Sequence, residues 1–307
     1  MEYLLLILAV ALGVSKNIFT KIVKKESASF YDTLKLNVVT FTCAFIAVFL
    51  IGIKSVETIF QVPWLLAVCY AVCTLGSQIS LMKAVELGSV SISSLFYSCG
   101  FMLPTLFGSI YYKEEINVLH IIGLVLIIIA FILSVKKETE KTFNIGWLIA
   151  ALGGLFFSGM VGIMQKLFSN EYSQYKMDNF LCVAFVFIIL ICVCSIFFAK
   201  LAKYNSNQGQ LEPKVEKEIK KRATPIKQYG FTVALGTVMG LVNKTNTFLS
   251  GVLSSVIVFP VINGGVILAT TVTSMFVFKE KLSIMQKLGL VIGILGIISI
   301  AIGKAVI

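Results

Sequence analysis

Ten stretches of about 20 mostly apolar residues constrain the fold of this chain more than any other feature. A helix needs about 20 such residues to cross about 30 Å of hydrocarbon, whereas the strands of a membrane barrel give shorter, alternating segments. We therefore predict an all-α integral membrane protein with ten transmembrane helices. The predicted helices lie at residues 3–23, 31–53, 62–86, 89–112, 118–135, 145–167, 178–199, 228–249, 251–278 and 283–303.

The composition supports this prediction and excludes several other classes of protein. Hydrophobic residues make up 58% of the chain and charged residues 13%, and the mean hydropathy is +0.95. A soluble domain is about 45–50% apolar and about 25% charged, so a soluble enzyme, a disordered chain and a disulfide scaffold are excluded. The net charge is +11, and in a membrane protein such an excess of lysine and arginine usually lies in the cytoplasmic loops. Nothing in the sequence resembles a nucleic-acid-binding surface.

Metal, cofactor and catalytic motifs are missing from the sequence. The seven cysteines all lie inside apolar runs and His120 is the only histidine, which favours small buried cysteines over a metal or redox site. Nucleophile, zinc and phosphate-binding motifs do not occur. We therefore expect no enzymatic activity, no cofactor, no metal ion and no direct use of ATP, and we expect His120 to lie at the surface.

The second half of the chain repeats the first. The segment Lys113-Glu114-Glu115-Ile116 and the later Gly123 match Lys279-Glu280-Lys281-Leu282 and Gly289, always 166 residues further on. Five helices per half is an odd number, so the second copy must enter the membrane in the opposite orientation. We predict two inverted five-helix repeats, residues 1–140 and 141–307, with a binding site near the membrane midplane between them.

One pair of lysines marks the ends of two repeated helices. Lys21, at the end of the first predicted helix, corresponds to Lys166 at the end of the sixth. Gln165 precedes Lys166, and we expect it to lie at the membrane interface. A charged loop at 200–227 separates the seventh and eighth helices and carries eight basic residues.

The repeated ends of the fourth and ninth helices carry a resemblance to a known family. Each has a mid-helix proline (Pro104, Pro260), a charged turn with a glutamate and a following helix with a glycine. In these features the chain resembles the drug/metabolite transporter superfamily, specifically its EamA-like members. The resemblance implies a multi-pass protein of the plasma membrane that moves a small-molecule substrate by alternating access, with coupling to protons or to a counter-substrate.

Two lysines are candidates for substrate binding, because a charge at membrane depth is costly and usually faces a cavity or a partner. Lys16 lies just past the centre of the first helix and Lys244 lies within the eighth. Lys83 is expected to pair with Glu86 or to reach the interface. Since acidic residues are otherwise confined to helix starts such as Asp178, we predict an anionic or zwitterionic substrate.

Neutral polar residues extend the predicted site. The predicted substrate-binding residues are Lys16, Asn17, Tyr97, Asn243, Lys244, Asn246 and Asn263. Helix-shaping roles are assigned to Pro104, Pro260, Gly264 and Gly265, because proline frees a backbone carbonyl and the two glycines permit local unwinding. Hydrogen bonding between neighbouring helices is the alternative role for the asparagines.

The sequence thus predicts a secondary-active transporter of a small organic metabolite. The alternative is a non-transporting membrane sensor or scaffold that acts through the 200–227 loop. The direction of transport and the oligomeric state have no sequence signal. The excess of lysine in alternate loops predicts that both termini lie outside the cell, whereas the family resemblance implies that they lie in the cytoplasm.

Overall fold

The computed structural model describes residues 2–24, 30–52, 61–88, 90–134, 145–206, 226–277 and 283–306. These residues form long helices joined by short turns, without strands in the described part of the chain. The helices are α1 (Glu2–Lys24), α2 (Phe30–Gly52), α3 (Trp64–Leu87), α4 (Val90–Cys99), α5 (Met102–Tyr111), α6 (Val118–Ser134), α7 (Ile145–Glu171), α8 (Met177–Ser206), α10 (Ile226–Val252), α11 (Ser255–Val277) and α12 (Ile284–Val306).

Seven of the described helices are long and apolar enough to cross a membrane, namely α1, α2, α3, α7, α8, α11 and α12. Helix α6 is a shorter apolar helix, and α4 and α5 have only 10 residues each. The all-helical membrane class predicted from the sequence is therefore confirmed. The full count of ten membrane crossings stays a prediction.

The two largest differences from the predicted helix boundaries are in the fourth and seventh predicted helices. The run at 89–112, predicted as one helix, is divided into α4 and α5, and α8 continues to Ser206 instead of ending near residue 199. The predicted 200–227 loop is therefore helical at its start and at its end, and most of it, residues 207–225, lies outside the described residues.

The break between α4 and α5 has a local backbone cause. The amide groups of Gly100, Phe101 and Leu103 each bond to the carbonyl three residues earlier, which is the tighter 3₁₀ pattern. Pro104 has no amide hydrogen to continue the normal ladder to Gly100. Gly100 also faces α7, where an added Cβ would lie 2.8 Å from the carbonyl oxygen of Leu155. The turn therefore lets the chain approach α7 closely.

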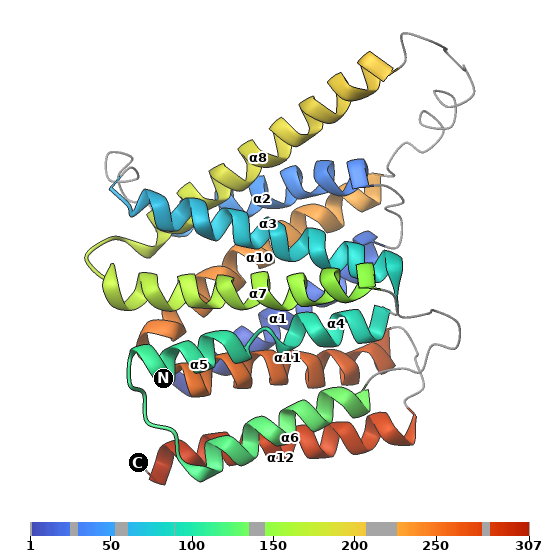
Figure 1. Cartoon of the computed structure of the whole chain (residues 1–307). Coiled ribbons are helices and arrows are strands. Elements are labelled where there is room, and N and C mark those ends of the chain that lie inside the picture. Colours follow the sequence, from blue (N-terminus) through green and yellow to red (C-terminus); the bar gives the residue numbers. More distant parts are fainter. Residues whose placement is uncertain are drawn as a thin grey trace.

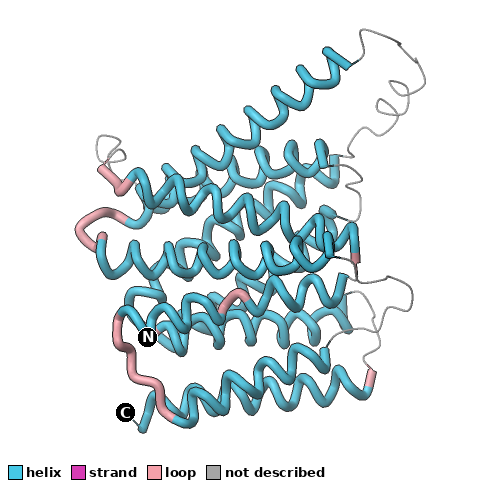
Figure 2. The backbone as a smooth tube through the Cα atoms, viewed as in Figure 1, coloured by secondary structure: helices cyan, strands magenta, loops and turns pink. Residues whose placement is uncertain are grey.

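The helices form a bundle in which both termini lie at the same end (Figure 1). The short described connections are confined to the ends of the helices and to the break between α4 and α5 (Figure 2). Helices α6 and α12 pack side by side at one edge of the bundle, and α2 packs against α8 at the opposite edge. Between them, α3 packs on α7, α10 packs on α1 and α2, and α11 packs on α1 and α5.

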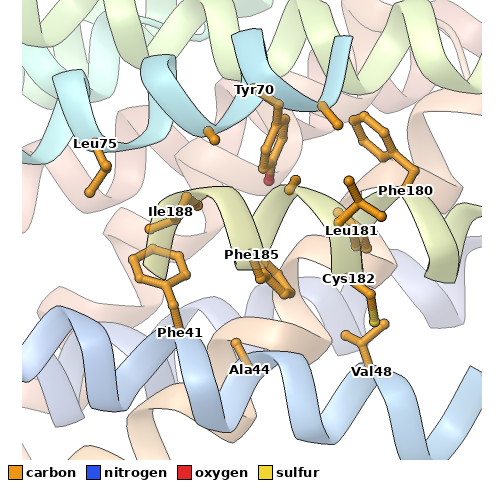
Figure 3. Packing of buried hydrophobic residues seen from close by; sticks show 14 of the residues in the cluster. Phe41, Ala44, Val48, Tyr70, Leu75, Phe180, Leu181, Cys182, Phe185 and Ile188 are labelled. Carbon is orange, nitrogen blue, oxygen red and sulfur yellow. The ribbon is translucent and has the colours of Figure 1, made fainter. Parts of the chain in front are cut away.

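The largest cluster of buried apolar residues joins α2, α3 and α8 (Figure 3). Phe180 stacks on Phe168 of α7 with ring centroids 4.2 Å apart, and it meets Tyr70 of α3 edge to face. Phe41 of α2 contacts Phe185 of α8. Aromatic pairs of this kind add about 0.5–1.5 kcal/mol beyond the burial of their area, so this edge of the bundle is firmly packed.

The starts of α6 and α12 share one local motif. The amide of His120 donates to Asn117 Oδ1 at 3.0 Å, and the amide of Asn117 donates back to His120 Nδ1 at 3.3 Å. The same two contacts recur 166 residues further along the chain. There the amide of Gln286 donates to Ser283 Oγ and the amide of Ser283 donates to Gln286 Oε1. Both are reciprocal capping boxes. The expectation of a surface His120 is wrong, since only 1% of it is exposed.

Candidate functional site

Lys16 lies on the inner face of α1. Ala9 and Val23 are seven residues before and after it, and Gly13 is three residues before it, which places all four on one side of the helix. These three neighbours are buried, whereas Ile7 on the opposite side is 70% exposed. At a rise of about 1.5 Å per residue, Lys16 lies about 4–5 Å past the middle of α1.

The ammonium group of Lys16 has no ion-pair partner in the part of the chain that the structure describes. Its side chain is half-buried, and only its backbone carbonyl is engaged, as the acceptor for Thr20 Oγ1 at 2.7 Å. A cation on an inward helix face without a carboxylate partner is unusual, because an uncompensated charge at this depth is costly.

Asn17, next to Lys16, connects α1 to α11. Its Nδ2 donates to Thr270 Oγ1 at 3.3 Å. The two helices also approach closely near this bond. An added Cβ on Gly265 of α11 would lie only 2.9 Å from the Val10 side chain of α1. The predicted residues Asn17 and Gly265 therefore lie at the α1–α11 contact that flanks Lys16.

Lys244 differs from Lys16 because it has an acidic partner. Its Nζ lies 2.7 Å from Oδ1 of Asp178, in the first turn of α8, and the two side chains are 25% and 17% exposed. Neighbouring Asn243 accepts a hydrogen bond from Tyr70 Oη at 2.6 Å and donates to the carbonyl of Met239. Asp178 does lie at a helix start as predicted, but it still supplies a carboxylate partner to Lys244, which the sequence did not predict.

The two predicted lysines lie toward opposite ends of the bundle. Lys16 precedes the end of α1 by eight residues and Lys244 precedes the end of α10 by eight residues. These helices pack against each other and run in opposite directions (Figure 1). The structure therefore does not bring Lys16 and Lys244 together at a single point.

Asn246 carries an unused hydrogen-bond acceptor. It lies one turn from Asn243 and one turn from the fully buried Ser250, so it belongs to the inner side of α10. Its Oδ1 is buried and has no hydrogen-bond partner among the described residues. A buried amide oxygen without a partner costs about 1–3 kcal/mol, so this position offers an acceptor to a ligand.

Helix α11 does not unwind where the sequence predicts it. It is continuous from Ser255 to Val277 although Pro260 lies inside it. Asn263 Nδ2 donates to the carbonyl of Phe259, its own helix neighbour, at 2.8 Å. Gly264 and Gly265 act instead as contact points for Ile127 and Val10. In the described chain, the helix is interrupted instead just before Pro104, where Gly100 begins the tighter turn between α4 and α5.

Tyr97 lies in the last turn of α4, just before that break. Its side chain is half-buried and its carbonyl accepts a hydrogen bond from Ser158 Oγ of α7 at 2.9 Å. The ring passes Gly154, whose added Cβ would lie 3.8 Å from Tyr97 Cδ2. Tyr97 therefore lies against α7, between the two halves of the chain.

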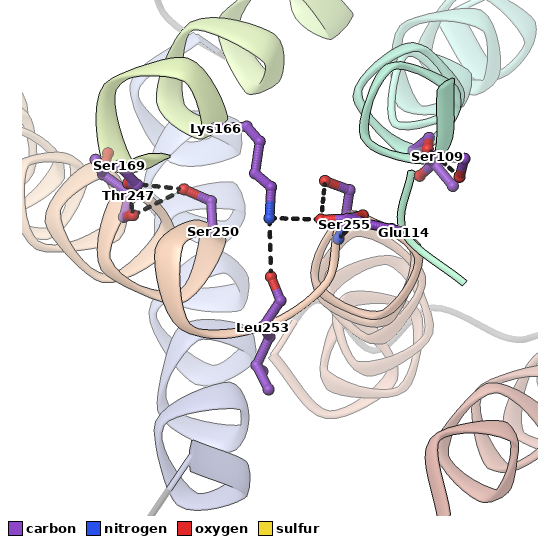
Figure 4. A network of polar contacts seen from close by, with 9 residues as sticks. Ser109, Glu114, Lys166, Ser169, Thr247, Ser250, Leu253 and Ser255 are labelled. Atoms are coloured by element: carbon purple, nitrogen blue, oxygen red, sulfur yellow. Dashed lines mark hydrogen bonds and ion pairs between the residues drawn. The ribbon is translucent and has the colours of Figure 1, made fainter. Parts of the chain in front are cut away.

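A buried ion pair in the described bundle was not predicted. Lys166 Nζ lies 2.7 Å from Glu114 Oε1, and the two side chains are only 4% and 12% exposed. The same ammonium donates to the carbonyl of Leu253 at 3.2 Å, and the amide of Ser255 donates to Glu114 Oε2 at 2.7 Å (Figure 4). The expectation that Gln165 lies at the interface is also wrong, because it is 4% exposed.

By contrast, the expected Lys83–Glu86 pair is present and lies at the surface of the bundle. Its two charged atoms are 2.9 Å apart and the side chains are 56% and 61% exposed. A pair this exposed contributes little to stability. Lys83 is therefore not part of the inner polar surface.

Residues 1–136 match the model of the EamA-like transporter family. This part of the chain contains α1 to α6, including Lys16, the broken helix with Pro104 and the glutamate that pairs with Lys166. For residues 1–136, the resemblance to the EamA-like members of the drug/metabolite transporter superfamily is thereby confirmed. The EamA match and the seven candidate spans also make this chain a multi-pass integral membrane protein.

A comparison with solved structures covers nearly the whole chain and concerns the fold alone. One crystal structure, described only as that of a protein, has a TM-score of 0.74 with this chain at 14% sequence identity. The match covers 99% of this chain and 96% of the other. No curated protein matches the sequence. At this identity the likeness shows the fold alone.

Proposed function

We propose that this protein is a secondary-active transporter that moves a small organic metabolite with an anionic or zwitterionic group by alternating access. The EamA match supports transport of a small molecule. The charge preference rests on one observation. Lys16 is a cation on the inner face of α1 without an acidic partner among the described residues, whereas Lys83, Lys166 and Lys244 each have one.

A carboxylate or phosphate group is the natural ligand for such a lysine. Charge-assisted hydrogen bonds are shorter and about twice as strong as neutral ones, and a bound anion would compensate the charge that Lys16 carries into the bundle. Asn17 and Asn263, on the facing sides of α1 and α11, would supply further polar contacts. The unused oxygen of Asn246 would accept a hydrogen bond from an ammonium or hydroxyl group of the same class of substrate.

The helix contacts support the two inverted repeats that such a mechanism requires. Suppose that α1, α2, α3 and α6 exchange places with α7, α8, α10 and α12. The contact of α3 with α7 then becomes that of α10 with α1, and the contact of α3 with α8 becomes that of α10 with α2. The pairs α2–α8 and α6–α12 are left unchanged. All of these contacts are present, as expected if residues 1–140 and 141–307 are two copies of one unit.

The two capping boxes support the same proposal. They place Asn117 with His120 and Ser283 with Gln286 at equivalent points of α6 and α12. The positions differ by the 166 residues found for the sequence repeat. The side chains are different, so the local geometry is kept while its chemistry has diverged.

Thermal unfolding of the purified protein tests the charge preference. The protein would be screened against amino acids, dicarboxylic acids, sugar phosphates, nucleotides, amines and neutral sugars. A ligand at about 100 times its Kd stabilises the folded state by about 2.7 kcal/mol. We expect the stabilising compounds to carry a carboxylate or phosphate, and we expect Lys16→Met to abolish their effect while Lys83→Met retains it. Stabilisation by amines alone would overturn the proposal.

Uptake into proteoliposomes tests transport itself. A compound that stabilises the protein should accumulate inside vesicles when its own gradient, a proton gradient or a counter-substrate is supplied. The alternative of a sensor or scaffold that acts through the 200–227 loop predicts binding without movement of the compound. Replacing residues 207–225 by a Gly/Ser linker should leave uptake unchanged if the protein is a transporter.

A further inference from the structure

The Lys166–Glu114 pair connects segments that are far apart in the chain at one end of the bundle. Lys166 lies in the last turns of α7, and Glu114 lies in the turn that joins α5 to α6. Leu253 and Ser255, which complete the network, lie at the turn between α10 and α11 (Figure 4). Both chain termini lie at this same end (Figure 1). The network therefore joins the first half of the chain to two separate parts of the second.

The turn that carries Glu114 is shaped for this contact. Lys113 has φ of 52°, the only positive φ of a non-glycine residue in the described chain, and such a conformation is unfavourable unless its surroundings hold it. The amide of Glu114 bonds back to the carbonyl of Gly108 at 3.4 Å. A Cβ on Gly108 would lie 2.5 Å from Glu114 Oε2 and 2.5 Å from Ser255 Cβ, so glycine is needed where the carboxylate meets α11.

Both charges depend on each other in this closed arrangement. A buried ion pair roughly offsets its own desolvation, but a buried charge left without its partner is strongly unfavourable. Lys166 has Glu114 and a carbonyl as its acceptors, and the ring centroid of Tyr112 lies 5.7 Å from its Nζ. Separating the two halves at this end would admit water to both charges. Each charge would then be hydrated and would no longer require its partner.

We propose that the Lys166–Glu114 ion pair is a lock that holds the bundle closed at the end where both termini lie. Opening of the substrate pathway on that side requires the pair to separate. The proposal rests on the proposed transport function for its purpose, but its test requires neither a substrate nor transport. A purely structural pair would stabilise the fold without biasing the two ends of the bundle differently.

The single substitutions should disfavour the closed state, whereas the double substitution should restore it. Glu114→Gln keeps an acceptor for the Ser255 amide but leaves the Lys166 charge buried without a partner, so it disfavours the closed state. Lys166→Met leaves the Glu114 charge without its cation and has the same effect. The double variant removes both charges, so closing no longer buries an unpaired charge and the closed state is restored.

Hydrogen–deuterium exchange on the full-length protein in lipid nanodiscs measures this bias. In each single variant we expect exchange to become about five- to tenfold faster in the first turns of α1 and α8, which lie at the end with the termini and outside the network. Peptides at the opposite end, such as residues 84–93, should not become faster. The double variant should return to wild-type rates. Glu86→Gln, which breaks the exposed Lys83 pair, is the matched control and should change neither end.

Three results would overturn the lock. The first is faster exchange at both ends, which indicates general loosening. The second is a change limited to residues 108–117 and 250–257, which indicates a local contact. The third is a double variant as fast as the single ones. If a variant fails to fold, charge exchange by Glu114→Lys with Lys166→Glu tests the same pairing and should recover wild-type rates. Failure of substrate binding in the thermal screen, with these exchange results intact, would contradict the transport proposal alone.

Discussion

His120 and Gln286 make the same capping contact at the starts of α6 and α12, although one is an imidazole and the other an amide. Each side chain accepts a hydrogen bond from the backbone amide three residues earlier. The first site also joins its helix to α12. Asn117, the capping partner of His120, also donates to the carbonyl of Gly303 on α12 at 2.8 Å.

This difference predicts unequal effects of two matched substitutions. Asn117→Ala removes a cap and a bond between helices, whereas Ser283→Ala removes a cap alone. Loss of a cap costs about 1 kcal/mol, and the lost bond to Gly303 adds about 0.5–1.5 kcal/mol. The apparent melting temperature should therefore fall further for Asn117→Ala. Equal melting temperatures would show that the bond to Gly303 contributes nothing.

Lys16→Met should weaken substrate binding without weakening the fold. Methionine keeps most of the apolar stem, and the substitution removes a charge that has no protein partner to leave behind. A charged hydrogen bond contributes about 1.5–3 kcal/mol, so affinity should fall by about tenfold or more. Calorimetric titration with a compound found in the thermal screen measures the affinity. An unchanged Kd would remove Lys16 from the site.

Lys244→Met should behave in the opposite way. It leaves the Asp178 carboxylate, which is 17% exposed, without its cation. Because the pair is partly hydrated, the cost should be about 1–2 kcal/mol, less than for a fully buried pair. The double variant with Asp178→Asn should recover much of this loss. A Lys244→Met protein as stable as wild type would mean that water already compensates Asp178.

Gly100→Ala tests the turn between α4 and α5. The added Cβ would meet the backbone of α7 at Leu155 and Gly159, which cannot move as a side chain tip can. We expect a loss of at least about 1–3 kcal/mol from this overpacking. Gly230→Ala in α10 is the control, because nothing lies within 4 Å of its added Cβ; it should leave stability unchanged or raise it by up to about 1 kcal/mol. Thermal unfolding of both variants makes the comparison.

The helices were predictable because hydropathy over a span is a local property of the sequence. The predicted ends of α1, α2 and α6 lie within about two residues of the observed ones, as expected for boundaries that different methods place one or two residues apart. The break at Gly100 was missed because the run at 89–112 contains no charged residue that would divide it. Its signal is a glycine four residues before a proline, and the proline alone does not predict a break, since α11 is continuous through Pro260.

The polar partners could not be predicted in the same way. Lys16 was identified because its depth in a helix can be counted along the chain. The partners of Lys166 and Lys244 are Glu114 and Asp178, both in turns or at helix starts, where hydropathy alone predicts exposure to water. Only the packing of helices distant in the sequence brings these carboxylates inward. The sequence therefore overestimated how many of its lysines lack partners.

The edge formed by α6 and α12 limits how the two halves can move. Gly123 of α6 and Gly296 of α12 face each other so closely that a Cβ on either would lie within 3 Å of the other's carbonyl oxygen. One helix of this pair comes from each half, and α2 and α8 form a similar pair at the far edge. The halves are thus joined along two parallel seams, one on each side of the inner helices. Motion that preserves both seams can only tilt the inner helices relative to these two helix pairs.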